Sequence, residues 1–202
     1  MKIRQHGRYQ YSPIGNRPIY DWPDRKKLAF YIALNIEHFS FGEGLGHTPT
    51  NPGRQPDVRN FAWRDYGLRV GIWRIFDLLD ELGLPACHLM NSSIYDYAAE
   101  IPERIRQRGD EFVGHGRTNS EQQSDYGEDD ERTLIDEVVS IFKKHEGNGP
   151  DGWMGPWISE SDVTPDLLKE AGCRYIMDWP CDDQPIWMKT RSGPLLSIPY
   201  HI

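Results

Sequence analysis

The sequence predicts an α/β fold in which short parallel strands alternate with helices. Short, almost entirely apolar segments recur along the 202 residues, and longer segments between them carry apolar residues at helical spacing. In addition, polar clusters rich in Asn, His and Gly follow several of the apolar segments. The length fits a single domain, since roughly 100–200 residues is the usual domain size.

The predicted elements follow one another in a regular order. Strands are expected at residues 28–36, 85–90, 111–113, 153–154, 174–177 and 195–198. Helices are expected at residues 65–82, 102–108, 128–145 and 164–171. The first strand has few polar residues, so we expect it to be buried on both faces. Thr164 followed by Pro165 is typical of a helix start, with the threonine as N-cap and the proline at the first helical position.

Two polar segments lie outside these elements. Residues 1–22 are interrupted by Pro13, Gly15 and Pro18, which predicts an ordered loop or a partner-binding arm ahead of a single domain over residues 23–202. Residues 39–60 are rich in glycine and proline and predict a long loop, and such loops are usually functional or mobile.

Composition excludes several classes of protein. The net charge of −8 argues against a nucleic-acid groove, which needs clustered Lys and Arg to neutralise phosphates. The longest apolar run, residues 28–34, is far shorter than the roughly 18 residues of a membrane-spanning helix, so no membrane partner is expected. The three cysteines have no CxxC spacing and predict neither a disulfide framework nor a zinc ribbon. Without an apolar signal-peptide core near the start, we expect a cytoplasmic location.

The residues that follow the predicted strands are the candidates for chemistry, because ligands collect at the carboxyl ends of parallel strands. Glu37 and His38 follow the first strand, where a carboxylate can act as a general base and an imidazole can bind metal, or both can belong to a solvated loop. His115 lies between two glycines after the third strand, as a ligand-contacting residue or a structural one. Asn119 follows four residues later and offers only a poor zinc ligand.

These strand-end motifs, taken in order, resemble those of the polysaccharide deacetylase superfamily, and more closely its allantoinase-like, cyclic-amide hydrolase branch. The matching segments are Asn35-Ile-Glu37-His38, residues 64–71, Gly114-His115-Gly116, residues 152–157, residues 164–172, residues 182–185 and residues 198–200. The resemblance implies a distorted, incomplete (β/α) barrel and hydrolysis of carbon–nitrogen bonds. Because the family pattern continues beyond residue 200, it also implies a catalytic domain truncated at its C-terminus.

The resemblance also implies a role for each matching residue. Glu37 stands at the position of the catalytic base, while His38 and His115 stand at positions of metal ligands. The family has a histidine where this chain has Asn119 and an aspartate where it has His38, so two of three usual ligands are changed. We therefore leave two possibilities open, a weakly bound divalent metal such as zinc or no metal at all.

The sequence-based hypothesis is a hydrolase of non-peptide C–N bonds that acts on a small amide, ureide or cyclic imide, or on an acetamido sugar. Glu37 and His115 are its predicted catalytic residues. The predicted substrate-binding residues are Arg117, Asn119, Trp157 and Asp183. The alternative is a non-catalytic carbohydrate- or ligand-binding member of the same fold. The sequence leaves the oligomeric state open, a homo-oligomer included.

Overall fold

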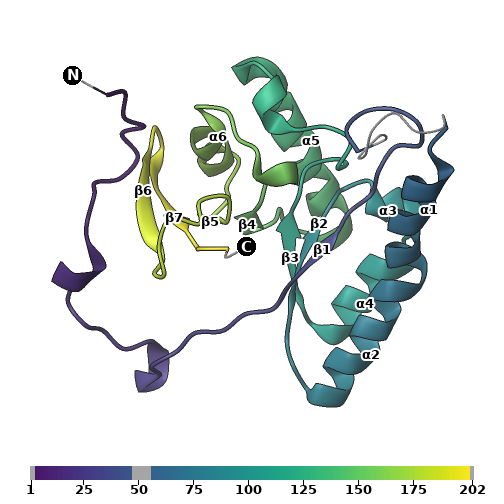
Figure 1. Cartoon of the computed structure of the whole chain (residues 1–202), viewed down its shortest axis with the longest axis horizontal. Coiled ribbons are helices and arrows are strands. Elements are labelled where there is room, and N and C mark those ends of the chain that lie inside the picture. Colours follow the sequence, from purple (N-terminus) through teal and green to yellow (C-terminus); the bar gives the residue numbers. More distant parts are fainter. Residues whose placement is uncertain (1–2, 47–55, 201–202) are drawn as a thin grey trace.

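The computed structural model describes residues 3–46 and 56–200, and these form an α/β fold around one mostly parallel sheet (Figure 1). The strands are β1 (Ala33–Ile36), β2 (Cys87–Met90), β3 (Glu111–Gly114), β4 (Gly152–Trp153), β5 (Tyr175–Ile176), β6 (Ile186–Thr190) and β7 (Gly193–Ser197). Their order in the sheet is β1-β2-β3-β4-β5-β7-β6, and only the β6–β7 pair is antiparallel. The predicted α/β class with parallel strands is therefore confirmed.

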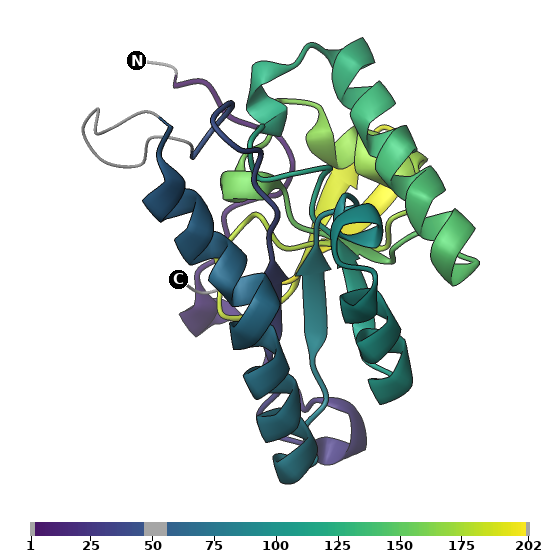
Figure 2. The same ribbon diagram turned by 90° about the vertical axis from the view of Figure 1, so that its right-hand side faces the viewer.

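The helices lie between the strands in the chain and pack against one face of the sheet (Figures 1 and 2). They are α1 (Val58–Tyr66), α2 (Ile72–Leu82), α3 (Ile94–Tyr97), α4 (Glu100–Arg108), α5 (Glu128–Glu146) and α6 (Thr164–Glu170). A π-helical segment, Gly67–Gly71, joins α1 and α2 into one continuous helix. None of the described helices combines the length and the apolar character that a membrane span requires.

Alternating side chains of the strands explain where the core lies. Trp153 and Ile176 point to the helical face, where they join the large apolar core that includes Phe76 of α2. Their neighbours Met154 and Met177 point to the other face and form a smaller cluster with Leu89. Burying each such side chain contributes about 1.5–3 kcal/mol, so both faces hold the sheet together.

Four sequence-based expectations about elements were wrong. The loop expected over residues 39–60 ends where α1 begins at Val58, ahead of the expected helix start at residue 65, and residues 47–55 of this loop lie outside the described residues. The first strand begins only at Ala33, where pairing with β2 starts, and Leu28 and Phe30 ahead of it are 79% and 81% exposed. Thr164 is not an N-cap: the cap residue is Val163, and the Thr164 hydroxyl is used for contacts to α5 and to residue 161. The antiparallel edge strand β6 was missed, because it mixes polar and apolar residues and has one face open to solvent.

The N-terminal arm, residues 3–22, runs along the β6 side of the molecule (Figure 1). Arg8 forms a two-fold ion pair with Asp166 at 2.8 and 2.7 Å, and its backbone carbonyl accepts from the amide of Lys189 in β6 at 2.8 Å. Arg17 pairs in the same way with Asp182 at 2.7 and 2.6 Å. Two-fold arginine–carboxylate pairs have defined geometry, so the arm is fixed along its length.

Candidate active site

The carboxylate of Glu37 lies just beyond the end of β1 and faces His115 from the end of β3. Its Oε1 atom is 3.6 Å from His115 Nε2 and accepts a hydrogen bond from Asn35 Nδ2 at 3.1 Å. The Glu37 side chain is 31% exposed, whereas that of His115 is 1% exposed. Two residues 78 positions apart in the sequence thus meet because β1 and β3 run parallel on either side of β2.

The ring of His115 is held in a fixed orientation. Its Nδ1 atom is 2.6 Å from the carbonyl oxygen of Met154. A carbonyl can only accept a hydrogen bond, so Nδ1 carries the proton and Nε2 is the atom presented to Glu37. Glycine is required at position 114, because a Cβ there would lie 2.5 Å from the ring of Trp153. Nε2 is buried and has no hydrogen-bond partner among the described residues.

The buried side chain of Asn91, just after β2, ties the strand-end loops together. Its Oδ1 atom accepts from the backbone amide of His38 at 2.8 Å, and its Nδ2 atom donates to the His115 carbonyl and, at 3.0 Å, to Asn119 Oδ1. The backbone amide of Asn119 in turn donates to the His38 carbonyl at 2.8 Å. Sequence reasoning noted the polar end of β2 but did not select Asn91, because its role depends on contacts between distant loops.

The side chains around Glu37 set its charge state. Burial raises the pKa of the carboxyl, but the nearby His115 and hydrogen bonds from Asn35 and Asn119 favour the ionised form more strongly, so the net pKa lies below its ordinary value. Since the Asn119 oxygen already accepts from Asn91, its NH₂ group is the part that can donate to Glu37. Glu37 is therefore a carboxylate at neutral pH, as a general base must be. Asn35 was likewise missed, since its importance lies in one contact to Glu37.

The ring of His38 contacts residues that follow β2. Its Nδ1 atom lies 2.9 Å from the Ser93 hydroxyl, and its ring stacks on that of Tyr97 with a centroid distance of 4.2 Å. Burial lowers the pKa of His38, while the nearby charge of Asp65 raises it less, which leaves the imidazole neutral at pH 7. It serves as a packed link between the β1 and β2 loops.

The donor set does not fit a family-type metal site. Within residues 3–46 and 56–200, no three His, Cys, Asp or Glu side chains are grouped so that they can hold a metal ion. Asn119 presents its NH₂ group to Glu37, and an NH₂ group is not a metal ligand. Of the two predicted ligands, His115 faces Glu37 and His38 faces Ser93.

Trp157 borders the same region from the β4 side. Its indole Nε1 donates to the Asn119 carbonyl at 2.9 Å, and its ring meets Phe39 edge-on at 6.4 Å. Trp157 is 48% exposed, so part of the residue lies at the surface beside this region. Glu37, His115, Asn119 and Trp157 thus form one connected group.

The structure does not bring Arg117 and Asp183 into this group. The Arg117 guanidinium donates to both carboxylate oxygens of Glu121, at 3.0 and 2.9 Å, and to Glu137 at 2.7 Å. Asp183 is exposed on the loop between β5 and β6. Their substrate-binding roles stay predictions, and the engagement of Arg117 with two carboxylates weighs against its role.

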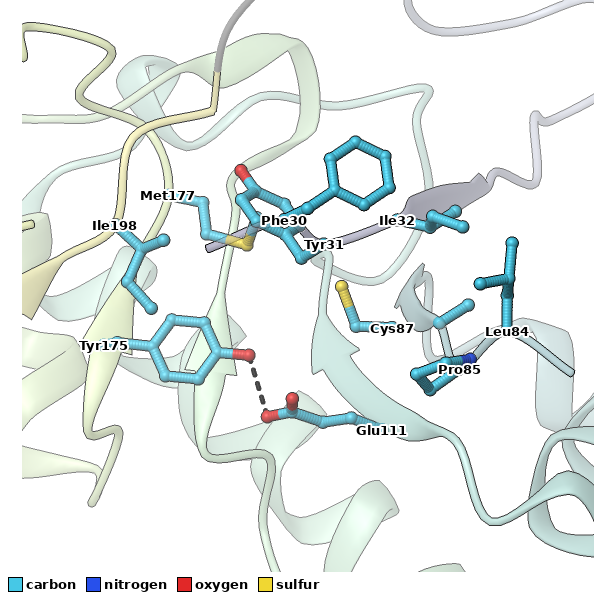
Figure 3. Close-up of a pocket in the computed structure, with 11 residues that line it drawn as sticks. Phe30, Tyr31, Ile32, Leu84, Pro85, Cys87, Glu111, Tyr175, Met177 and Ile198 are labelled. Carbon is cyan, nitrogen blue, oxygen red and sulfur yellow. Dashed lines mark hydrogen bonds between the residues drawn. The ribbon is translucent and has the colours of Figure 1, made fainter. Parts of the chain in front are cut away.

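Two cavities help to locate the open space. Glu37 lines one of about 340 Å³ between β1 and the α1–α2 helix, together with Phe39 and Arg64. A larger one, of about 400 Å³, lies mainly at the opposite ends of the strands, where Tyr175 donates to Glu111 at 2.8 Å (Figure 3). The larger cavity is apolar and contains none of the predicted site residues, so size alone does not identify the site.

Comparisons with known proteins agree with this architecture. The chain is 27% identical over 106 residues to the peptidoglycan deacetylase of Helicobacter pylori, which covers 52% of this chain and 36% of that protein. The solved structures of Puue allantoinase and of a probable polysaccharide deacetylase from Pseudomonas aeruginosa PAO1 each superpose with a TM-score of 0.79 and 25% identity. Each covers 93% of this chain and 67% of the other. No family model matches the sequence.

The fold and the strand-end site define the chain as an α/β protein of the incomplete-barrel type. Together with the similarities above, they confirm the resemblance to the polysaccharide deacetylase superfamily, with allantoinase-like relatives. The chain spans only about a third of the Helicobacter pylori protein and about two thirds of the two solved structures.

Proposed function

We propose that this chain carries the active site of a hydrolase that cleaves a non-peptide carbon–nitrogen bond. The observation that supports this proposal is the 3.6 Å approach of His115 Nε2 to the carboxylate of Glu37, whose side chain is 31% exposed. The similarity to proteins named as a peptidoglycan deacetylase and an allantoinase supports the same class of reaction. The proposed substrate is a small amide, ureide or cyclic imide.

Glu37 acts as the general base in this proposal. The carboxylate removes a proton from a water molecule as the water attacks the amide carbonyl carbon. The amide groups of Asn35 and Asn119 keep Glu37 ionised between turnovers, because they hydrogen-bond to its charged form. No metal takes part in this scheme, since the described residues do not fit one.

His115 serves the second half of the reaction. The Met154 carbonyl fixes its ring so that Nε2 alone faces the reacting atoms. A protonated Nε2 donates to the oxyanion of the tetrahedral intermediate and then passes its proton to the leaving nitrogen. The short distance between Glu37 and Nε2 allows the proton that Glu37 takes from the attacking water to pass to Nε2, which is the source of the proton that the leaving nitrogen receives.

The test is a hydrolysis screen on cyclic imides, ureides, linear amides and acetamido sugars, with product formation followed by NMR. We expect turnover of at least one small amide, ureide or imide, and loss of this turnover in His115→Ala. Glu43→Gln, which changes an exposed carboxylate in the following loop, is the matched control and should retain full activity. A screen without turnover in any class would remove the proposal.

A non-catalytic ligand-binding protein is the second candidate. The observation that favours it is Asn119, whose amide stands where the family has a metal ligand and bonds to Asn91 and Glu37 instead. Calorimetry with Glu37→Gln distinguishes the two candidates. A binding protein keeps its ligand affinity within a few-fold and shows no turnover in either form, whereas a hydrolase keeps binding and loses turnover.

A further inference from the structure

Two carboxyl groups, the half-buried Glu160 and the buried Asp178, lie beyond the ends of β4 and β5, apart from the Glu37–His115 pair. Asp178 Oδ1 accepts from the backbone amide of Gly155 at 2.8 Å, and Glu160 Oε2 accepts from Trp179 Nε1 at 2.9 Å. The second oxygen of each group, Asp178 Oδ2 and Glu160 Oε1, is buried without a hydrogen-bond partner in the described part of the chain. Burying an ionised carboxylate in this way is costly, whereas a protonated carboxyl can itself donate.

The charges around the two groups favour the protonated form. Burial is the main cause that raises the pKa of Glu160, to about 8, and the charge of Glu131 adds to it. Burial and then the charge of Glu160 raise the pKa of Asp178 well above its usual range. The charge of Arg8 lowers the pKa of Glu160, but the Arg8 guanidinium is already bonded to Asp166.

The groups around the pair come from α5, from α6 and from the arm. The titratable and charged side chains among them are Glu131 of α5, Asp166 of α6, and His6 and Arg8 of the arm. Glu131 already accepts hydrogen bonds from Gln123, Ser161 and Thr164. Trp179, the donor to Glu160, packs against the His6 ring at 5.4 Å. No cation of the described chain forms an ion pair with either Glu160 or Asp178.

The pair is connected to the candidate active site through the loop after β4. Asp178 holds the amide of Gly155, where a Cβ would lie 2.5 Å from the Ser159 carbonyl oxygen. Two residues further, Trp157 and Ile158 have positive φ angles of 63° and 52°, which side-chain-bearing residues adopt only where the surroundings hold them. Trp157 then donates to the Asn119 carbonyl.

We propose that Glu160 and Asp178 retain a proton near neutral pH, and that this protonated pair positions the Trp157 loop against Asn119. Loss of the proton leaves two facing negative charges in a buried space, so Asp178 shifts and carries Gly155 with it. Both carboxyls are positioning residues. The contact of Trp157 with substrate rests on the proposed function, whereas the proton and the loop position do not.

The proton is tested by infrared spectroscopy and by unfolding, neither of which requires a substrate. At pH 7 the unmodified protein should show the C=O band of a buried protonated carboxylic acid, and Asp178→Asn and Glu160→Gln should weaken it. Because both pKa values are raised in the folded state, stability should fall as the pH rises from the ordinary carboxyl range to about 8. Between pH 5 and pH 8 we expect the unfolding constant to rise at least about tenfold more in the unmodified protein than in either variant.

Asp162→Asn is the matched control, because it changes an exposed carboxylate of the same segment, and it should behave as the unmodified protein. An infrared spectrum of the unmodified protein without the acid band at pH 7 would overturn the proposal even if the variants do not fold. The same pH dependence of unfolding in the unmodified protein and both variants would also overturn it.

The loop position is tested by fluorine NMR of protein labelled with fluorotryptophan, with Trp157→Phe used to assign the Trp157 signal. We expect this signal to shift as the pH is raised through about 8, and to lose that shift in Asp178→Asn and Glu160→Gln. A Trp157 signal that does not respond to pH, or responds equally in the variants, would contradict a positioning role. Failure of the hydrolysis screen alone would leave these results unaffected and would count only against the proposed function.

Discussion

Two carboxyl groups at the same edge of one sheet have opposite protonation behaviour. Glu37, beyond β1, has a pKa below its ordinary value, whereas Asp178, beyond β5, has a raised pKa. Burial raises the pKa in both places and is the largest single contribution to each. The difference therefore comes from the neighbours.

The neighbours of Glu37 are donors and those of Asp178 include another acid. Glu37 accepts hydrogen bonds from Asn35 and Asn119 and lies 3.6 Å from His115, and all three neighbours favour the charged form. Asp178 has backbone donors only, and the adjacent Glu160 repels its charge. The comparison indicates that the number and type of donors, more than depth of burial, decide which strand end can supply a base.

The largest expected effect concerns activity. Glu37→Gln should lower kcat/KM by about 10²–10⁴-fold, since it removes a general base while keeping shape and hydrogen bonding. Asp178→Asn should lower it by less than about tenfold, because Asp178 acts only through the Trp157 loop. Steady-state kinetics on the substrate found by screening would measure both. Equal losses in the two variants would break the distinction between the two regions.

The next effect concerns stability. Asn91→Ala removes three hydrogen bonds and leaves buried partners unsatisfied, so we expect a loss of about 2–4 kcal/mol in the free energy of unfolding. Asn35→Ala removes the bond to Glu37 from an exposed residue and should cost less than about 1 kcal/mol. Urea unfolding monitored by circular dichroism gives both values. Similar costs would show that Asn91 does not hold the loops together.

Much of the fold follows from local patterns in the sequence, but the site follows only partly. The helix α5 and the strands β2 and β3 were predicted within one or two residues, because their apolar residues follow a regular pattern and glycines mark the ends of α5 and the end of β3. The edge strand β6 was missed, since only one of its five residues is buried and two are exposed. Periodicity reports burial, and an edge strand is only partly buried.

The strand-end rule selected Glu37 and His115, and the structure places them 3.6 Å apart. It did not select Asn35 and Asn91. An asparagine at a strand end can be solvated or can hydrogen-bond to other loops, and the local sequence is the same in both cases. The sequence analysis missed the Glu160–Asp178 pair for the same reason. Their proximity depends on the turn over residues 156–158.

A smaller effect should appear in the pH profile. The net pKa of Glu37 is lowered in the folded protein. Its ionised form, which stabilises the fold, is therefore fully present above the ordinary carboxyl pKa. This stabilisation is lost only as the pH falls through the lower, folded-state pKa. The acid limb of kcat/KM should therefore lie below the ordinary value. Asn35→Ala removes one donor and should move this limb upward. A limb above the ordinary carboxyl pKa in the unmodified protein would contradict the assignment.

The smallest expected effect is that of removing metal. The region around Glu37 is built from amides and one imidazole, and Asn119 directs its NH₂ group to the carboxylate, so a divalent ion would displace hydrogen bonds that stabilise the charge of Glu37. Two imidazoles facing different partners bind zinc weakly. Dialysis against chelator should change kcat/KM by less than about twofold, and elemental analysis should then find well under one zinc per chain. Added zinc should inhibit the reaction if it binds His115. Activity that is restored by zinc after dialysis would contradict this prediction, because it would require ligands that the described residues do not supply.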